Sequence, residues 1–193
     1  MIIEPSEIEK YFEECNEESK VREFKNQLTD ADGWGVASAC VILSEDFIRE
    51  FWNKVNWSAI SCHQKLSSKF VKEFADKIEW DEFIKYGNIT REILESCGEY
   101  IDWSSVIFYN KIDEDILEKH WRDFKKVDYE KLIKYQHLSE KFIKKHKSMY
   151  WNIDGNIGAI IIYQKHLSRE FKRKLLLRHR QMLYKFLNEK FEK

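Results

Sequence analysis

Residues 43–64 read LSEDFIREFWNKVNWSAISCHQ, and residues 66–86 repeat this text in altered form as LSSKFVKEFADKIEWDEFIKY. The repetition has a constant spacing, because four tryptophans stand 23 residues apart at Trp34, Trp57, Trp80 and Trp103. An apolar or small residue follows three positions later each time, at Ala37, Ile60, Phe83 and Val106. With seven tryptophans in the whole chain, this spacing indicates an internal repeat.

The frame continues beyond the fourth tryptophan if two insertions are allowed. Tyr129 and Ile157 then take the tryptophan position, and Leu132 and Ile160 follow them. The insertions lie in the segments HWRDFKKVD and KSMYWNIDGN, directly before these residues.

A second column of the repeat predicts where helices begin. An apolar residue precedes a good helix N-cap at Ser44, Ser67, Thr90, Asp113, Ser139 and Ser168. Three residues after each cap stands a large apolar residue: Phe47, Phe70, Ile93, Ile116, Phe142 or Phe171. The spacing predicts a first helix of about ten residues, with Phe47, Phe51 and Val55 on one face.

A second cap directly precedes the tryptophan position, at Asn56, Glu79, Asp102, Asp128 and Asn156. It predicts a second helix of about eight residues, anchored by residues such as Trp57 and Ile60. Helices this short are marginal alone, and one pair cannot bury its own apolar face. The sequence therefore predicts an all-α fold, an α-solenoid of about six helix-turn-helix units, and an elongated molecule.

The ends of the chain depart from the repeat. Residues 1–33 form a glutamate-rich, divergent N-terminal cap with two degenerate helices, residues 34–167 hold the repeats, and residues 168–193 predict one longer basic helix that closes the array. We expect the whole of 1–193 to be a single domain. The apolar positions of the last helix keep a rough helical stripe, at Phe171, Leu175, Leu176, Met182, Leu183, Phe186, Leu187 and Phe191.

Composition supports the helical prediction. The 193 residues are 43% hydrophobic and include one proline and six glycines, few for a fold built on Gly/Pro turns. No run approaches the roughly 18 to 20 apolar residues that span a bilayer. The first residues are acidic where a signal peptide is basic, so we expect a cytoplasmic protein without a membrane partner. The four cysteines lack zinc spacing and are interpreted as reduced packing residues.

The net charge of −1 conceals a gradient. Residues 1–50 hold 5 Lys/Arg against 13 Asp/Glu, a net charge of −8, and residues 51–136 hold 14 against 16. Residues 137–193 hold 14 against 5, a net charge of +9. Such a distribution bears on association and electrostatic steering, not on the fold.

The phrase LSEDFIREFWNKVNW, with its echoes LSSKFVKEFADKIEW and LSEKFIKK, resembles a short tandem repeat of uncharacterised proteins from bacteriophages and large DNA viruses. The resemblance covers residues 34 to about 172. It implies a viral origin and a binding role, and it transfers no catalytic residue. For a viral protein, the expected cytoplasmic location is the host cell. The later units depart from the pattern through their insertions, which argues against regular stacking there.

Motifs for catalysis or cofactor binding are missing from the sequence. The six histidines form no metal-binding pair, and no phosphate loop, dinucleotide fingerprint or nucleophile elbow occurs. His63 stands in a column otherwise filled by tyrosines, which favours a structural role. Paired carboxylates are typical of solvated helix faces. We therefore expect no enzyme, no cofactor and no metal site.

The position at the end of each second helix is a candidate binding surface. Its copies should line up along one edge of the solenoid, and we call them the ledge. It contains Tyr86, Tyr109, Tyr135 and Tyr163, followed by Gly87, Asn110, Gln136 and Gln164, with His63 and Gln64 at the first position. In the structural interpretation, each tyrosine packs on the next unit and each amide caps carbonyls or bonds to a neighbouring loop. In the functional one, the ledge binds a peptide or a single strand.

The basic C-terminal region is the other candidate surface. Its cations are Lys144, Lys145, Lys147, Arg169, Lys172, Arg173, Lys174, Arg178 and Arg180. They are either a solvated helix face or a site for phosphate backbones. The leading hypothesis is a non-enzymatic viral protein that binds a host protein or complex, such as a CRISPR effector of a defence system, and inhibits it. The alternative is a nucleic-acid-binding module that uses the basic region.

Overall fold

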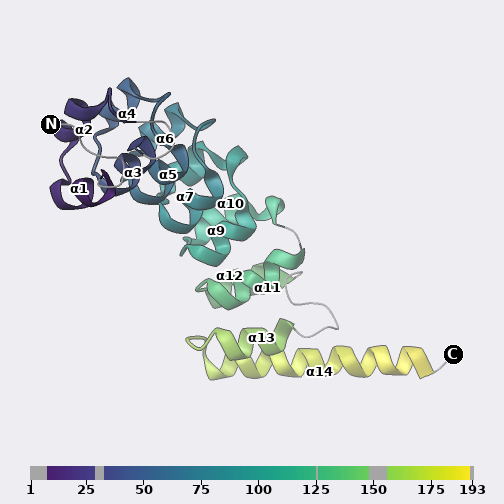
Figure 1. The fold of residues 1–193 in the computed structure, drawn as a ribbon. Coiled ribbons are helices and arrows are strands. Elements are labelled where there is room, and N and C mark those ends of the chain that lie inside the picture. Colours follow the sequence, from purple (N-terminus) through teal and green to yellow (C-terminus); the bar gives the residue numbers. More distant parts are fainter. Residues whose placement is uncertain (1–7, 29–32, 125, 148–155, 192–193) are drawn as a thin grey trace. The chain divides into compact units, whose positions relative to one another are not determined.

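The computed structural model describes residues 8–28, 33–124, 126–147 and 156–191 (Figure 1). Every regular element in these residues is a helix, which confirms the all-α prediction. The first helices of the repeat are α4 (Glu45–Glu50), α6 (Ser68–Glu73), α8 (Arg91–Ser96), α10 (Glu114–Lys119), α12 (Glu140–Lys145) and α14 (Arg169–Phe191). The second helices are α3 (Gly33–Cys40), α5 (Trp57–His63), α7 (Trp80–Tyr86), α9 (Trp103–Tyr109), α11 (Lys126–Tyr135) and α13 (Asn156–Tyr163).

Two further helices precede the repeats, α1 (Ile8–Cys15) and α2 (Glu18–Phe24), as the sequence predicts for the acidic N-terminal segment. Phe12, Val21 and Phe24 of these helices are buried. The segment therefore contributes to the apolar core as well as carrying acidic charge. Short 3₁₀ helices, Gly98–Tyr100 and Trp121–Asp123, follow α8 and α10.

The chain forms two compact units, Met1–Asp102 and Trp103–Lys193. In the first unit, helices α1, α3, α5 and α7 lie side by side in chain order, and α6 packs against α8 (Figure 1). In the second unit, α9, α11 and α13 lie side by side in chain order, and α14 packs against α13. Within each unit, the repetition in sequence is therefore a repetition in space. None of the helices in the described ranges is long and apolar enough to cross a membrane.

Both apolar columns of the repeat form the core. The residues three positions after the tryptophan position are all 0% exposed: Ala37, Ile60, Phe83, Val106, Leu132 and Ile160. The residues three positions after the first cap are at most 5% exposed: Phe47, Phe70, Ile93, Ile116, Phe142 and Phe171. The predicted frame is thus confirmed through both insertions.

The predicted caps are confirmed in part. The side-chain oxygens of five first caps accept a hydrogen bond from the N–H three residues later, namely those of Ser44, Ser67, Thr90, Ser139 and Ser168. Asn56 caps α5 in the same way. Asp113 and Glu79 make no such side-chain bond. Asp128 was placed wrongly, because α11 begins at Lys126 and this residue lies inside the helix.

The first helices are shorter than predicted. α4 has six residues and ends at Phe51, whose N–H donates to the carbonyl of Phe47. The chain then turns, and the N–H groups of Lys54 and Val55 both donate to the carbonyl of Phe51. The turn returns Val55 to the core, where it is 7% exposed. The prediction of its burial is right, although the residue is not helical.

The C-terminal helix α14 has 23 residues, which confirms a longer last helix. Of its predicted apolar stripe, Phe171 and Leu175 are buried, whereas Leu176 is 51% exposed, so its assignment to the stripe is wrong. Leu176 precedes Leu177, which is 50% exposed. The side chains of the other predicted stripe residues lie outside the described ones: Met182, Leu183, Phe186, Leu187 and Phe191.

Candidate binding surfaces

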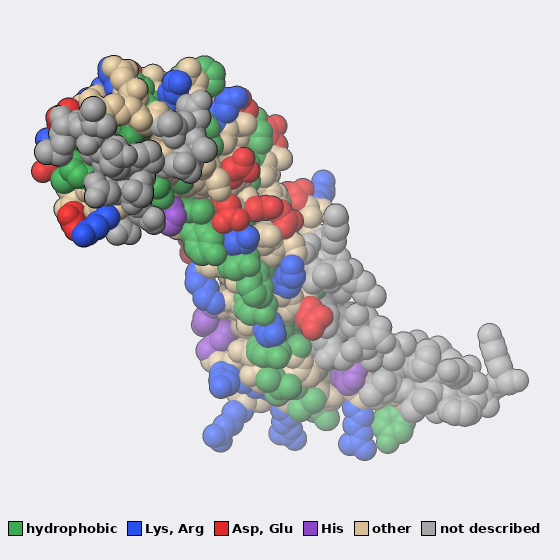
Figure 2. All heavy atoms as spheres, viewed as in Figure 1, with side chains coloured by type: hydrophobic (Ala, Val, Ile, Leu, Met, Phe, Trp, Pro, Cys, Tyr) green, Lys and Arg blue, Asp and Glu red, His purple; other side chains and the backbone are tan. Residues whose placement is uncertain are grey.

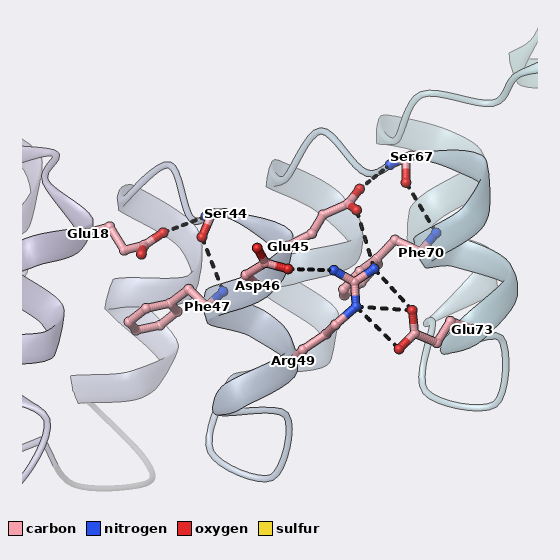
Figure 3. Close-up of polar contacts among 9 residues, drawn as sticks. All are labelled: Glu18, Ser44, Glu45, Asp46, Phe47, Arg49, Ser67, Phe70 and Glu73. Atoms are coloured by element: carbon pink, nitrogen blue, oxygen red, sulfur yellow. Dashed lines mark hydrogen bonds and ion pairs between the residues drawn. The ribbon is translucent and has the colours of Figure 1, made fainter.

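Glutamates at the start of the first helices join neighbouring repeats. Glu45 Oε1 accepts a hydrogen bond of 2.6 Å from the backbone N–H of Ser67, the next first cap (Figure 3). This N–H would otherwise lack a partner at the helix start. The same joint links Glu18 to Ser44, Glu114 to Ser139, and Glu140 to Ser168. In α8 and α14, the residue directly after the cap is an arginine, Arg91 or Arg169. These are the final cap-led helices of the first and second unit.

Arg49 makes a second joint between α4 and α6. Its Nε lies 3.0 Å from Glu73 Oε2, its Nη1 lies 3.0 Å from Asp46 Oδ1, and its guanidinium lies over the ring of Phe70 (Figure 3). Arg22 and Glu50 form the corresponding ion pair between α2 and α4, at 2.5 Å. These charges hold helices together, so they are poor candidates for partner binding.

The glutamines of the predicted ledge column clamp the preceding repeat. Gln136 Nε2 donates to the carbonyls of Ile107 at 2.6 Å and Asn110 at 2.7 Å, and its Oε1 accepts from the N–H of Ile112 at 2.9 Å. Gln64 and Gln164 make the same three bonds to their own preceding repeats. All three side chains are at least 95% buried. The structural interpretation of these amides is confirmed.

The tyrosines of that column behave differently. Tyr86 is 67% exposed and belongs to the first unit, whereas Tyr109, Tyr135 and Tyr163 lie on successive second helices of the second unit. Tyr109 and Tyr163 are 49% and 47% exposed. Packing on the next unit therefore does not account for Tyr86, Tyr109 and Tyr163, whereas Tyr135 is half-buried.

Phe108 joins the tyrosines of the second unit into one surface. Its ring centroid lies 4.7 Å from that of Tyr109 and 4.6 Å from that of Tyr135, both edge-to-face. Lys134 Nζ continues the line, 5.1 Å from the ring centroid of Tyr135 and 5.8 Å from that of Tyr163. We call Phe108, Tyr109, Tyr135 and Tyr163 the aromatic row. Figure 2 shows hydrophobic side chains gathered in a strip on one face of the second unit.

Sequence reasoning missed Phe108, because its column holds no constant residue type. The equivalent positions are Cys62, Lys85, Lys134 and Ile162. One signal in the sequence could have revealed Phe108. It forms an aromatic pair with Tyr109 at the end of a second helix, and the buried face of that helix is already occupied by Val106.

The cations of the basic C-terminal region fall into two sets. Lys144, Lys145 and Lys174 pair with Glu140, Glu118 and Glu170, and Lys172 donates to a backbone carbonyl. The Arg180 guanidinium lies over the ring of Tyr184. Among the described side chains, the other four of these cations take part in no ion pair, hydrogen bond or cation–π contact: Lys147, Arg169, Arg173 and Arg178. All of the predicted basic residues are exposed except Lys172, which is half-buried.

Three histidines, His137, His146 and His166, contact other side chains. His146 Nε2 lies 2.8 Å from Glu118 Oε1 and its ring packs on Trp121. Burial raises the pKa of Glu118, but the hydrogen bonds from Lys145 and His146 outweigh it and hold the pKa below its usual value. His137 and His166 stack on each other with ring centroids 3.6 Å apart. Within the described residues, no group of three or more His, Cys, Asp or Glu is placed to hold a metal ion.

Two hollows lie in the second unit. The larger has a volume of about 410 Å³ and lies where the repeat joint runs, so its polar groups are already used: Glu114 bonds Ser139, Gln136 bonds Ile112, and Lys111 bonds the carbonyl of Tyr135. The smaller, of about 90 Å³, lies between α12 and α14 and is lined by Lys144, Phe171, Lys174, Leu175 and Arg178.

No known family model matches the chain, and neither a curated protein nor a solved structure matches it. The resemblance to viral tandem repeats therefore stays a prediction. The surfaces themselves carry the functional argument.

Proposed function

We propose that the chain is a non-enzymatic interaction protein, an α-solenoid of short helix pairs whose aromatic row binds a protein partner. The observation that carries the proposal is the exposure of Tyr109 and Tyr163 at one repeated position, with Phe108 exposed beside them, whereas the apolar columns of the same helices are buried. The solenoid part is supported by the side-by-side order of the second helices within each unit.

The aromatic row has the properties of a protein-binding hot spot. Tyrosine and other aromatic residues are enriched at such sites, because they offer a large contact area with few rotatable bonds. Edge-to-face contacts hold Phe108 between Tyr109 and Tyr135, so less conformational entropy remains to be lost on binding. Lys134 adds a positive charge beside the rings.

A protein suits the row better than a single nucleic-acid strand. Proteins that bind single strands offer aromatic faces on which successive bases stack. Here, the edge of each neighbouring ring fills the space beside Phe108, and Lys134 lies over the rings of Tyr135 and Tyr163. The narrower hypothesis of a viral inhibitor of a host defence complex, such as a CRISPR effector, rests on the repeat resemblance and the small size of the chain.

Affinity capture from a host-cell lysate, quantified by mass spectrometry, tests the proposal. The test variant replaces Tyr109, Tyr135 and Tyr163 by serine. The control replaces Tyr86 and Ile42, which are 67% and 75% exposed in the first unit, by serine. We expect the test variant to lose the proteins that the wild type enriches and the control to retain them, with circular dichroism unchanged in both. Retention by the test variant would contradict the proposal.

Nucleic-acid binding is a second candidate, favoured by the unpaired cations of the basic region. The second unit holds 21 Lys/Arg against 12 Asp/Glu, a net charge of +9. Phosphate contacts release counterions, so such binding weakens steeply with salt. A mobility-shift titration at two salt concentrations, with Arg173, Lys174, Arg178 and Arg180 reversed to glutamate in a variant, tests it. The absence of a shift at low salt would exclude this function.

A further inference from the structure

The hollow between α12 and α14 combines an apolar floor with a basic rim. Phe171 and Leu175 are 5% and 2% exposed and form the floor, whereas Lys144, Lys174 and Arg178 are exposed and surround it. The four residues from α14 follow the spacing i, i+3, i+4, i+7, which places them on one face of that helix. The groove is thus lined mainly by one face of α14, with Lys144 of α12 on its other side.

The rim cations are available to a ligand. Lys144 and Lys174 pair with Glu140 and Glu170, at 3.5 Å and 2.5 Å, in exposed i,i+4 pairs. Such pairs contribute little free energy in water, so a lysine can exchange its partner at small cost. Arg178 has no ion pair with any described side chain.

The volume of the groove fits one apolar side chain. Its 90 Å³ corresponds to about three liquid water molecules at ~30 Å³ each, enough for a side chain of a few carbons. Lys144 Nζ lies 5.1 Å from the ring centroid of Phe171, over the ring face that a nucleic-acid base would need for stacking. The groove therefore favours a small aliphatic side chain of a peptide over a base.

We propose that this groove binds an acidic peptide segment of a partner protein. One apolar side chain of the segment enters between α12 and α14 and covers Phe171 and Leu175, and neighbouring carboxylates accept hydrogen bonds from Lys174 and Arg178. The site is separate from the aromatic row, so it does not rest on the function proposed above. Charge complementarity sets the class of ligand, and the apolar floor sets its anchor.

Fluorescence anisotropy on the full chain at physiological salt tests the ligand class. The probes are a short labelled Asp/Glu peptide with one central leucine, the same peptide with a central alanine, and a short single-stranded DNA of comparable charge. We expect the leucine peptide to bind about tenfold more tightly than the alanine peptide, since it buries several more apolar carbons. Equal affinity of the two peptides, tighter binding of DNA, or no binding of any probe would overturn the proposal.

Matched charge reversals on one helix test the location. The groove variant is Lys174→Glu with Arg178→Glu, and the control is Arg169→Glu with Arg173→Glu, which lies on the other side of α14 at 100° per residue. Both change the net charge by the same amount. We expect the groove variant to weaken the leucine peptide at least about tenfold and the control at most about threefold. Equal losses would show diffuse attraction and would overturn the proposal. Unchanged helical circular dichroism verifies that both variants fold.

Discussion

The side-chain amide of Gln164 donates a 2.7 Å hydrogen bond to the backbone carbonyl of Gln136, and Gln136 makes the same bond to Asn110 one repeat earlier. Gln136 therefore takes part in two consecutive joints between repeats: its side chain bonds to the preceding repeat, and its backbone carbonyl accepts from the following one. Because both glutamines are almost fully buried, water cannot replace these bonds when a side chain is removed.

Gln136→Leu should lower the free energy of unfolding by about 3 kcal/mol, since it leaves the carbonyls of Ile107 and Asn110 and the N–H of Ile112 without their partner. Urea denaturation followed by circular dichroism measures the loss. The control Gln181→Leu changes an exposed glutamine of α14 and should stay within about 0.5 kcal/mol. A loss below about 1 kcal/mol for Gln136→Leu would show that the clamp contributes little.

Gly87→Ala and Gly158→Ala should change stability in opposite directions. A Cβ at Gly87 would lie 2.3 Å from the ring of Phe83, which is fully buried, and 2.7 Å from its backbone oxygen, so we expect a loss of about 1–3 kcal/mol. A Cβ at Gly158 in α13 meets no atom within 4 Å, and alanine there should stabilise the helix by up to about 1 kcal/mol. Thermal unfolding of the two variants decides the signs, and equal signs would contradict the prediction.

Ser67→Ala should destabilise the first unit by about 1 kcal/mol through the loss of its bond from the N–H of Phe70. The contact of Glu45 with the backbone N–H of Ser67 does not involve the serine side chain and remains. Ser67→Thr keeps a hydroxyl at the cap and is the control, with a change of a few tenths of a kcal/mol. Amide hydrogen exchange at Phe70 should be faster only in the alanine variant.

Glu118 should make stability fall at acid pH. Hydrogen bonds from Lys145 and His146 hold its folded-state pKa below the ordinary value of about 4.3, despite the opposing effect of burial. The folded state therefore binds the proton less readily than the unfolded state. The stabilisation is fully present above the ordinary pKa and is lost as pH falls through the lowered one. The difference in unfolding free energy between wild type and Glu118→Gln should thus shrink from pH 6 to about pH 3, and a constant difference would contradict this origin.

The buried columns of the repeat could be predicted from the sequence, because they depend on local periodicity. The spacing that places Ile60 three residues after Trp57 puts it on the inner face of a short helix in any copy. The residues at which the helices end were harder to predict from the sequence. α4 ends at Phe51 because the chain turns there and returns Val55 to the core. A longer helix would bury the same residues, so the apolar pattern does not distinguish the two structures.

The candidate surfaces depended on the neighbours of each side chain. The column of tyrosines and amides left a structural and a binding interpretation open, and the structure buries Gln136 as a clamp and leaves Tyr109 half exposed. The same holds for the basic region, where Lys145 is paired with Glu118 and Arg173 has no described partner. The type of a residue and its position in a helix do not predict which groups of the neighbouring repeat will contact its side chain.

By itself, the sequence determined the helix pair, its main caps and the apolar residues inside it, since those follow from spacing along one chain segment. The tertiary structure decided which polar groups join repeats, that Phe108 links the tyrosines of the second unit, and that α12 and α14 enclose an apolar floor with a basic rim. The physical reason is that burial and pairing are properties of side chains brought together from different repeats.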